Sequence, residues 1–156
     1  MGSALSRQYP PRPIVGIGVV VWHDDRVLLV RRGKPPRRGQ WSLPGGAQQL
    51  GETVAEAARR EVREEVGLEV ALGEIIATVD LIERDPEHRV RYHYTLIDFT
   101  AETMSPVLRP GSDAADARWF ELAEIETLGL WSETVRIIKL ARERRPCRSP
   151  GDDATR

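Results

Sequence analysis

The sequence predicts one α+β or α/β domain in which a sheet and helices pack as a sandwich, and three observations carry this prediction. The chain has 156 residues, 40% of them hydrophobic and 30% charged, which suits a globular domain with a sizeable core. Residues 14–22 form a nearly continuous apolar, β-rich run, which is typical of a buried strand. Residues 54–66 carry an apolar residue at every fourth position, which indicates an amphipathic helix between strands.

The segments before this helix predict a hairpin and a glycine-containing loop. Ile14 to Trp22 is the first strand, and Arg26 to Arg31 reads as its hairpin partner. Residues 31–40 form a basic loop, after which Trp41 to Leu43 is expected as a short strand. In Pro44-Gly45-Gly46, we expect the glycine pair to adopt backbone angles closed to a β-branched residue.

Both ends of the helix are marked in the sequence. Thr53 is a good N-cap, and Glu56 three residues later completes a capping box. Gly67 suits the left-handed position that ends a helix. The residues expected to face the core are Val54, Ala58, Val62 and Val66.

Further strands and a second helix follow. Residues 74–83 and 89–100 are expected as strands, and residues 101–116 as a loop rich in Pro, Gly, Ser and Asp. Residues 117–120 form a short strand, and residues 132–144 a second amphipathic helix. Its expected inward residues are Val135, Ile138 and Leu140, and the expected core aromatic residues are Trp22, Trp119 and Phe120.

The domain organisation follows from the polar ends of the chain. We expect residues 1–12 to form a flexible arm, residues 13–145 a single domain and residues 146–156 a disordered tail. The single cysteine, Cys147, leaves no intramolecular disulfide and no cysteine metal cluster.

Charge and hydropathy exclude some partners. The net charge of −1 argues against broad electrostatic binding to nucleic acid or to an anionic membrane. No apolar run reaches the length of a membrane span, and the N-terminus lacks the hydrophobic segment of a secretory signal. We therefore expect a cytoplasmic protein whose partner is a small molecule.

Three glutamates on the first helix suggest a metal site. Glu61, Glu64 and Glu65 are three and four positions apart, so their side chains share one face. Their charges repel one another, and the helix dipole disfavours negative charge in the last turn. A divalent cation would remove both penalties, and carboxylate oxygens suit Mg²⁺ or Mn²⁺.

A plain structural interpretation competes with the metal site. Arg59, Arg60 and Arg63 are interleaved with the glutamates, and a solvated helix laced with ion pairs is a common pattern. The glycines before the helix favour the metal site, because they permit a sharp turn that could bring a backbone carbonyl beside the carboxylates.

The same segment resembles a known family. Gly46, Glu52, Arg60-Glu61-Val62, Glu64-Glu65 and Gly67-Leu68 stand at the spacing of the complete signature of the Nudix hydrolases, the Nudix box. A strand pair precedes it and another follows it, as in that family. The resemblance implies an α/β/α sandwich around a mixed β-sheet and hydrolysis of a nucleoside diphosphate linked to another group.

The resemblance also implies roles for individual residues. Glu61 and Glu65 would bind the metal directly, Glu64 would be a ligand or lie close to one, and Gly45 would offer its backbone carbonyl. Glu52 and Arg60 would brace the loop against the helix through an ion pair, with Gly46 supporting the close approach.

Several residues could serve as the general base. In the family this role falls to a glutamate of the box, here Glu64, or to an acidic residue of a later loop. Asp113 and Asp116 stand in such a loop, and Glu102 is a more distant candidate. Each could equally be an ordinary polar loop residue.

Candidate substrate contacts precede the box. The basic cluster before it could clamp phosphate or could be a solvated loop, and Arg31 and Arg32 at a strand end are the preferred contacts. Trp41 could stack on a base or pack in the core. The cluster comprises Arg31, Arg32, Lys34, Arg37 and Arg38.

The stretch from Trp41 to Gly46, with Arg31-Arg32-Gly33 upstream and His93 to Phe99 downstream, resembles the ADP-ribose pyrophosphatase-like branch. This resemblance implies ADP-ribose as substrate, cleaved to AMP and ribose 5-phosphate. The alternatives are a nucleoside triphosphate pyrophosphohydrolase that removes oxidised nucleotides, and a non-catalytic domain that senses a nucleotide sugar. Specificity would rest on loops and on a subunit interface, so a homodimer is one assembly to consider.

Overall fold

A computed structural model describes residues 7–34, 37–111 and 114–146, and within these ranges seven strands form one mixed sheet. The strand order is β3-β2-β1-β6-β5, with β4 paired to β1 and β7 paired to β2. The strands β1 and β6 run parallel at the centre, and the other paired strands are antiparallel. The strands are β1 (Ile14–His23), β2 (Arg26–Arg32), β3 (Trp41–Ser42), β4 (Gly45–Ala47), β5 (Ala71–Arg84), β6 (Val90–Glu102) and β7 (Ala114–Glu121). The helices are α1 (Val54–Val66), α2 (Leu122–Ile125) and α3 (Ser132–Arg144).

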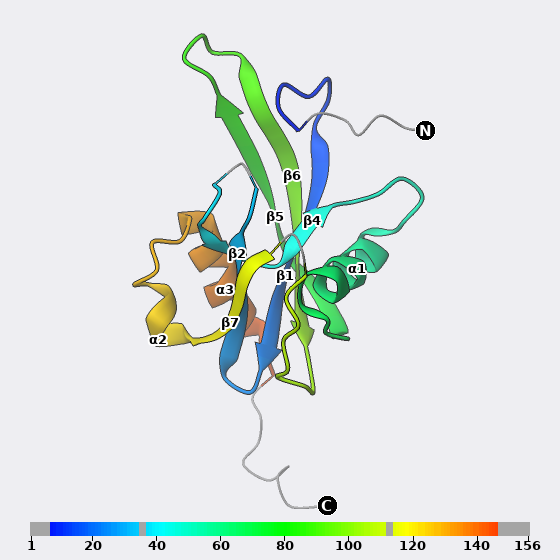
Figure 1. Ribbon diagram of the computed structural model, residues 1–156, viewed down its shortest axis with the longest axis vertical. Helices are drawn as coiled ribbons and strands as arrows, with labels where there is room; N and C mark the ends of the chain where they lie inside the picture. The colour runs from blue at the N-terminus through cyan, green and yellow to red at the C-terminus, as the bar shows by residue number, and fades with distance from the viewer. Residues whose placement is uncertain (1–6, 35–36, 112–113, 147–156) are drawn as a thin grey trace, which may run out of the picture.

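Alternation along β1 builds a separate core on each face of the sheet. Ile17, Val19 and Val21 pack in the core beneath α1, whereas Val20 and Trp22 pack in the core beneath α3. The two helices cover opposite faces of the sheet in Figure 1. The α/β/α sandwich around a mixed sheet is therefore confirmed.

The helix α1 begins and ends where the sequence predicts. The Oγ1 atom of Thr53 accepts a hydrogen bond of 3.0 Å from the backbone N–H of Glu56. Gly67 adopts φ 72° and donates its N–H to the carbonyl of Arg63. Val62 and Val66 are fully buried, and each contributes about 1.5–3 kcal/mol of apolar burial. This packing fixes the rotation of the helix and turns the glutamate face away from the core beneath α1.

The glycine pair after Pro44 is part of a strand rather than a turn. Gly45 pairs with Gly18 and Gly46 with Ile17 across an antiparallel ladder between β4 and β1. Neither glycine adopts a positive φ, and the left-handed angle before α1 belongs to Gly51 at φ 88°. The prediction of restricted backbone angles at Gly45 and Gly46 is wrong, because close approach is what excludes a side chain there.

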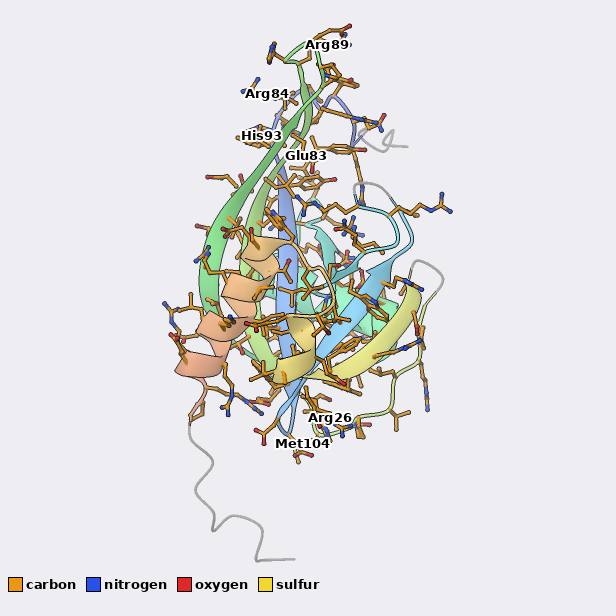
Figure 2. The ribbon with its side chains drawn as sticks, turned by 90° about the vertical axis from the view of Figure 1, so that its left-hand side faces the viewer. Arg26, Glu83, Arg84, Arg89, His93 and Met104 are labelled. Atoms are coloured by element: carbon orange, nitrogen blue, oxygen red, sulfur yellow. The ribbon has the colours of Figure 1, made fainter. Side chains whose placement is uncertain are left out.

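The β5–β6 hairpin projects beyond the rest of the sheet (Figure 1). Glu83, Arg84, Arg89 and His93 lie toward its projecting end, opposite Arg26 and Met104 (Figure 2). The described part of the expected flexible arm, residues 7–12, is attached to this hairpin. Tyr9 donates its N–H to the carbonyl of Arg91, and its hydroxyl donates to Asp85 at 2.9 Å.

The C-terminal half differs from the prediction in two places. The strand β7 begins at Ala114, so the loop before it is shorter than expected. In α3, Thr134, Ile137, Ile138 and Ala141 are buried, whereas Val135 is half-buried. Apolar residues cover a wide arc of this helix, and contact with the sheet selects which part of that arc is buried. In the described ranges, no helix has both the length and the apolar character needed to cross a bilayer.

We expect Ile138→Ala to lower the free energy of unfolding by about 2–5 kcal/mol, because it opens a cavity beneath α3. The matched variant Val135→Ala removes a half-buried side chain and should cost clearly less. Urea denaturation of both variants measures the difference. Equal losses would contradict the observed orientation of α3.

Candidate active site

The glutamate face of α1 lines a cavity of about 340 Å³ beside β4. Its lining includes Glu61, Glu64 and Glu65 of α1 and Gly45 and Gly46 of β4. The cavity therefore joins anionic side chains to exposed backbone groups. Its lining also includes Arg7, Arg31, Arg32, Lys34, Gln48, Gln49 and Arg60.

The carboxylate of Glu61 lies directly against Gly46. A Cβ atom on Gly46 would stand 2.5 Å from Cδ of Glu61, which is closer than real Cβ contacts allow. The Glu61 side chain is only 13% exposed. Burial raises the pKa of Glu61, and a hydrogen bond from Arg60 opposes the rise. The site therefore places a carboxylate where more positive charge would stabilise it.

The other two glutamates differ in their surroundings. Glu65 accepts a hydrogen bond of 3.2 Å from the backbone N–H of Gly45, which ties the end of α1 to β4. Glu64 is 58% exposed and contacts Nη1 of Arg60 at 3.2 Å. Glu64 is thus the member of the set that is open to solvent.

Arg60 holds the loop and the helix together. Its guanidinium forms a bidentate pair with Glu52, at 2.6 and 2.9 Å, and donates to the carbonyl of Ala47 at 3.1 Å. The hydrogen bonds from Arg60 lower the pKa of Glu52. Nη1 of Arg60 also contacts Glu61 at 2.8 Å. The ion pair between Glu52 and Arg60 is present as the family resemblance implies, and it extends to the candidate metal ligands.

The donor set of the cavity fits a hard divalent cation. Mg²⁺ and Mn²⁺ favour oxygen ligands. The cavity offers carboxylate oxygens from one face of α1 and lies beside the backbone of β4. In the ranges described, no three His, Cys, Asp or Glu side chains converge as a ready-made cation site. Nη1 of Arg60 lies against Glu61 and Glu64, and Glu65 is directed to the N–H of Gly45. Arg60 therefore supplies the positive charge in this arrangement.

Of the predicted substrate contacts, Arg32 is the most central. It is half-buried, lines the cavity and lies near Glu65, and burial lowers the pKa of its guanidinium. Arg31 also lines the cavity, but its Nε donates to the carbonyl of Gly39. Arg37 turns elsewhere, with its guanidinium 4.5 Å from the ring centre of Trp131. The basic cluster thus divides between the cavity and the surface.

Trp41 does not line this cavity. Its ring packs edge-on against Phe120 at 5.1 Å between ring centres, and Arg31 and Arg118 lie over it at 5.6 Å. These contacts favour the packing interpretation of Trp41 over stacking on a base.

The candidate bases lie apart from one another. Asp113 falls outside the described residues. Asp116 belongs to β7, where Arg118 holds its carboxylate at 2.8 Å. Glu102 lies at the end of β6 and pairs with Arg145 at 2.6 Å. The structure thus brings Glu64 into the cavity, but it places neither Asp116 nor Glu102 in the lining.

Sequence reasoning missed a second cavity, of about 140 Å³, on the α3 side of the sheet. It adjoins the first, because Arg7, Arg32, Leu43 and Gly45 line both. Arg7 belongs to the arm that the sequence predicts to be flexible. Asp98 also lines this cavity, and an acidic residue inside an apolar strand pattern is the sequence signal that marks it.

The family model and the relatives identify the chain as a hydrolase that acts on phosphorus anhydrides. The model of the NUDIX domain matches residues 12–141, and the chain belongs to the Nudix hydrolase family. It is 32% identical over 123 residues to the ADP-ribose pyrophosphatase of Methanocaldococcus jannaschii, covering 79% of this chain and 70% of that protein.

Two further proteins extend the comparison. The human 8-oxo-dGDP phosphatase NUDT18 is 29% identical over 148 residues, covering 87% of this chain but only 43% of that longer protein. The NUDIX domain of Shewanella oneidensis NrtR, whose structure was solved with ADP ribose, superposes with a TM-score of 0.71 at 25% identity. That superposition covers 85% of this chain and 88% of the other.

We expect different defects from valine at the two glycines. A Cβ on Gly45 would stand 1.8 Å from the backbone oxygen of Ile17, so Gly45→Val should disrupt the sheet and lower the melting temperature. In Gly46→Val the new side chain meets the movable carboxylate of Glu61, so activity should fall more than stability.

The control is Ala47→Val, at a position that already carries a Cβ in the same strand. Thermal melts and initial hydrolysis rates would be compared across the three variants. Identical behaviour would refute the close-approach explanation of the glycine pair.

Proposed function

We propose that this protein hydrolyses the pyrophosphate linkage of a nucleoside diphosphate derivative, with ADP-ribose cleaved to AMP and ribose 5-phosphate. The observation that carries the proposal is one cavity that combines the three carboxylates of α1 with the cationic side chain of Arg32. A pyrophosphate needs both parts, because its own charges repel a nucleophile and must be neutralised.

Each group of residues has a distinct task in this proposal. Glu61 and Glu65 hold a divalent cation, Glu64 binds it or lies beside it, and Gly45 offers its carbonyl. Such a cation neutralises phosphate charge and makes bound water more acidic. The bidentate ion pair between Arg60 and Glu52 keeps the loop and the helix in register.

The remaining residues bind substrate and accept a proton. Arg32 binds a phosphate oxygen from the cavity wall, with Arg31 at the rim. Glu64 is the favoured general base, because it lines the cavity and is exposed to water. Asp113 stays an alternative, whereas the ion pair with Arg118 disfavours Asp116.

Two comparisons support ADP-ribose. One relative is an ADP-ribose pyrophosphatase, and a structural neighbour was solved with ADP ribose bound. The second candidate is hydrolysis of an oxidised purine nucleotide, which the likeness to an 8-oxo-dGDP phosphatase favours. A purely sensing role has no chemical need for the three carboxylates that line the cavity.

Loss of one ligand carboxylate should separate catalysis from folding. We expect Glu65→Gln to lower kcat/KM at limiting Mg²⁺ by at least a hundredfold, about 2.7 kcal/mol of transition-state stabilisation. The amide oxygen can still accept the hydrogen bond from Gly45, so the melting temperature should change little. The control Glu56→Gln alters an exposed glutamate outside the cavity and should keep full activity. Near-normal activity of Glu65→Gln would overturn the assignment of Glu65 as a metal ligand.

The substrate can be tested directly by comparing kcat/KM for ADP-ribose, dGTP and 8-oxo-dGTP at one Mg²⁺ concentration, with products identified. We expect ADP-ribose to be preferred at least tenfold, which corresponds to about 1.4 kcal/mol of differential transition-state binding. A triphosphate ends in a free phosphate and carries more charge, so its site needs more cationic contacts, whereas ADP-ribose requires a site that grips a sugar at each end of the pyrophosphate. A tenfold preference for either triphosphate would overturn ADP-ribose as the substrate, and only a preference for 8-oxo-dGTP would favour the second candidate.

A further inference from the structure

The N-terminal arm is attached to the β5–β6 hairpin by contacts between residues far apart in the chain. The Nε2 atom of Gln8 donates a hydrogen bond of 3.0 Å to the hydroxyl of Tyr92. Tyr9 donates its backbone N–H to the carbonyl of Arg91 at 2.7 Å, and its hydroxyl donates to Asp85 at 2.9 Å. In Figure 1 the arm loops beside the projecting hairpin. The start of the described chain thus has a defined attachment point.

This attachment holds Tyr9 in one conformation. Its acceptor, the carboxylate of Asp85, is only 6% exposed and also accepts hydrogen bonds of 2.9 Å from the backbone N–H and the Nε of Arg89. The guanidinium of Arg89 lies 5.3 Å from the ring centre of Tyr9. Tyr9 adopts φ 51°, a left-handed angle that residues other than glycine adopt rarely and that surrounding contacts must maintain. The hairpin therefore sets the path of the chain at Tyr9.

Arg7, two residues before Tyr9, lies in the lining of the carboxylate cavity. None of the hydrogen bonds that attach the arm uses its guanidinium, and the residue is exposed. Burial raises the pKa of Glu61, with Arg60 and Arg7 opposing the rise. Burial lowers the pKa of Arg32, and the charge of Arg7 adds to the lowering. Arg7 is therefore close to both a candidate metal ligand and the main candidate phosphate contact.

We propose that Arg7 binds a phosphate oxygen of the substrate together with Arg32, and that Tyr9 and Asp85 position Arg7 for this task. The inference rests on the proposed function, because it requires a substrate with a phosphate anhydride. A guanidinium presents a fork of N–H donors that matches phosphate oxygens. Two cations in one cavity repel each other, and an anion bound beside both would offset that repulsion.

The position of these residues in the chain separates binding from positioning. Arg7 precedes residues 12–141, which match the family model, so it is a contact that this chain adds to the shared domain. The carboxylates come from α1, Arg32 comes from β2 and Arg7 comes from the arm, so three separate segments would surround the phosphates. Tyr9 and Asp85 line neither cavity. They can influence the substrate only through Arg7, which makes them positioning residues.

The binding test uses α,β-methylene-ADP, a nucleoside diphosphate analogue whose bridging carbon resists hydrolysis, and measures its affinity by calorimetry in the presence of Mg²⁺. We expect Arg7→Gln to weaken binding roughly fivefold or more, because it removes a charged donor to phosphate. Arg7→Lys keeps the charge and should lose less. The matched control Arg12→Gln removes an exposed arginine of the same arm that lines neither cavity, and it should keep the wild-type affinity.

The positioning test uses Tyr9→Ala, which removes the hydroxyl bound to Asp85 and the ring beside Arg89. We expect this variant to bind the analogue roughly threefold more weakly, because Arg7 is then no longer held at the cavity. In the double variant Arg7→Gln/Tyr9→Ala the second change should add no further loss, since Tyr9 acts through Arg7. A general loosening of the fold would instead weaken binding in both backgrounds.

The proposal is overturned if the wild type does not bind the analogue, or if Arg7→Gln binds it as tightly as Arg12→Gln does. It is also overturned if Tyr9→Ala keeps the wild-type affinity or causes the same loss in the absence of Arg7. Hydrolysis of ADP-ribose by the wild type is measured separately. An absence of hydrolysis together with the expected binding pattern would reject the proposed reaction and retain Arg7 as a phosphate contact.

Discussion

The pairing of β4 with β1 is the contact on which both cavities depend. At Gly45 the two strands approach so closely that a Cβ atom would lie 1.8 Å from a backbone oxygen of β1. This approach holds β4 between the carboxylates of α1 and the apolar pocket beneath α3, so that residues of β4 line both cavities. A bulkier residue would separate the strands and move the candidate metal ligands relative to the substrate.

Electrostatics of the site centre on Arg60. Three glutamates on one helix face would repel one another, and burial of Glu61 adds a further cost. Arg60 contacts Glu52, Glu61 and Glu64 and also a carbonyl of β4, so one cation balances the helix face and ties the loop to it. The interleaving of basic and acidic residues in the sequence therefore supports both interpretations considered for it. The basic and acidic side chains form an ion-pair network. The same network holds Glu61 and Glu64 in the lining of the cavity.

The two faces of the sheet carry different kinds of cavity. Alternate residues of β1 point to opposite faces, and one cavity lies beside α1 whereas the other lies beneath α3, with residues of β4 lining both. In the proposed function the reaction takes place beside α1, where the carboxylates lie.

The sequence by itself determined the parts of the protein that depend on neighbouring residues. Thr53 and Gly67 mark the ends of α1, and the spacing of Glu61 and Glu65 places them on one face, because capping and helical periodicity are local properties. The tertiary structure alone decided the rest, since strand register joins residues far apart in the chain. Only that register gives Gly45 its steric role, places Asp116 with Arg118 in β7 and brings Asp98 over Gly18 into a cavity beneath α3.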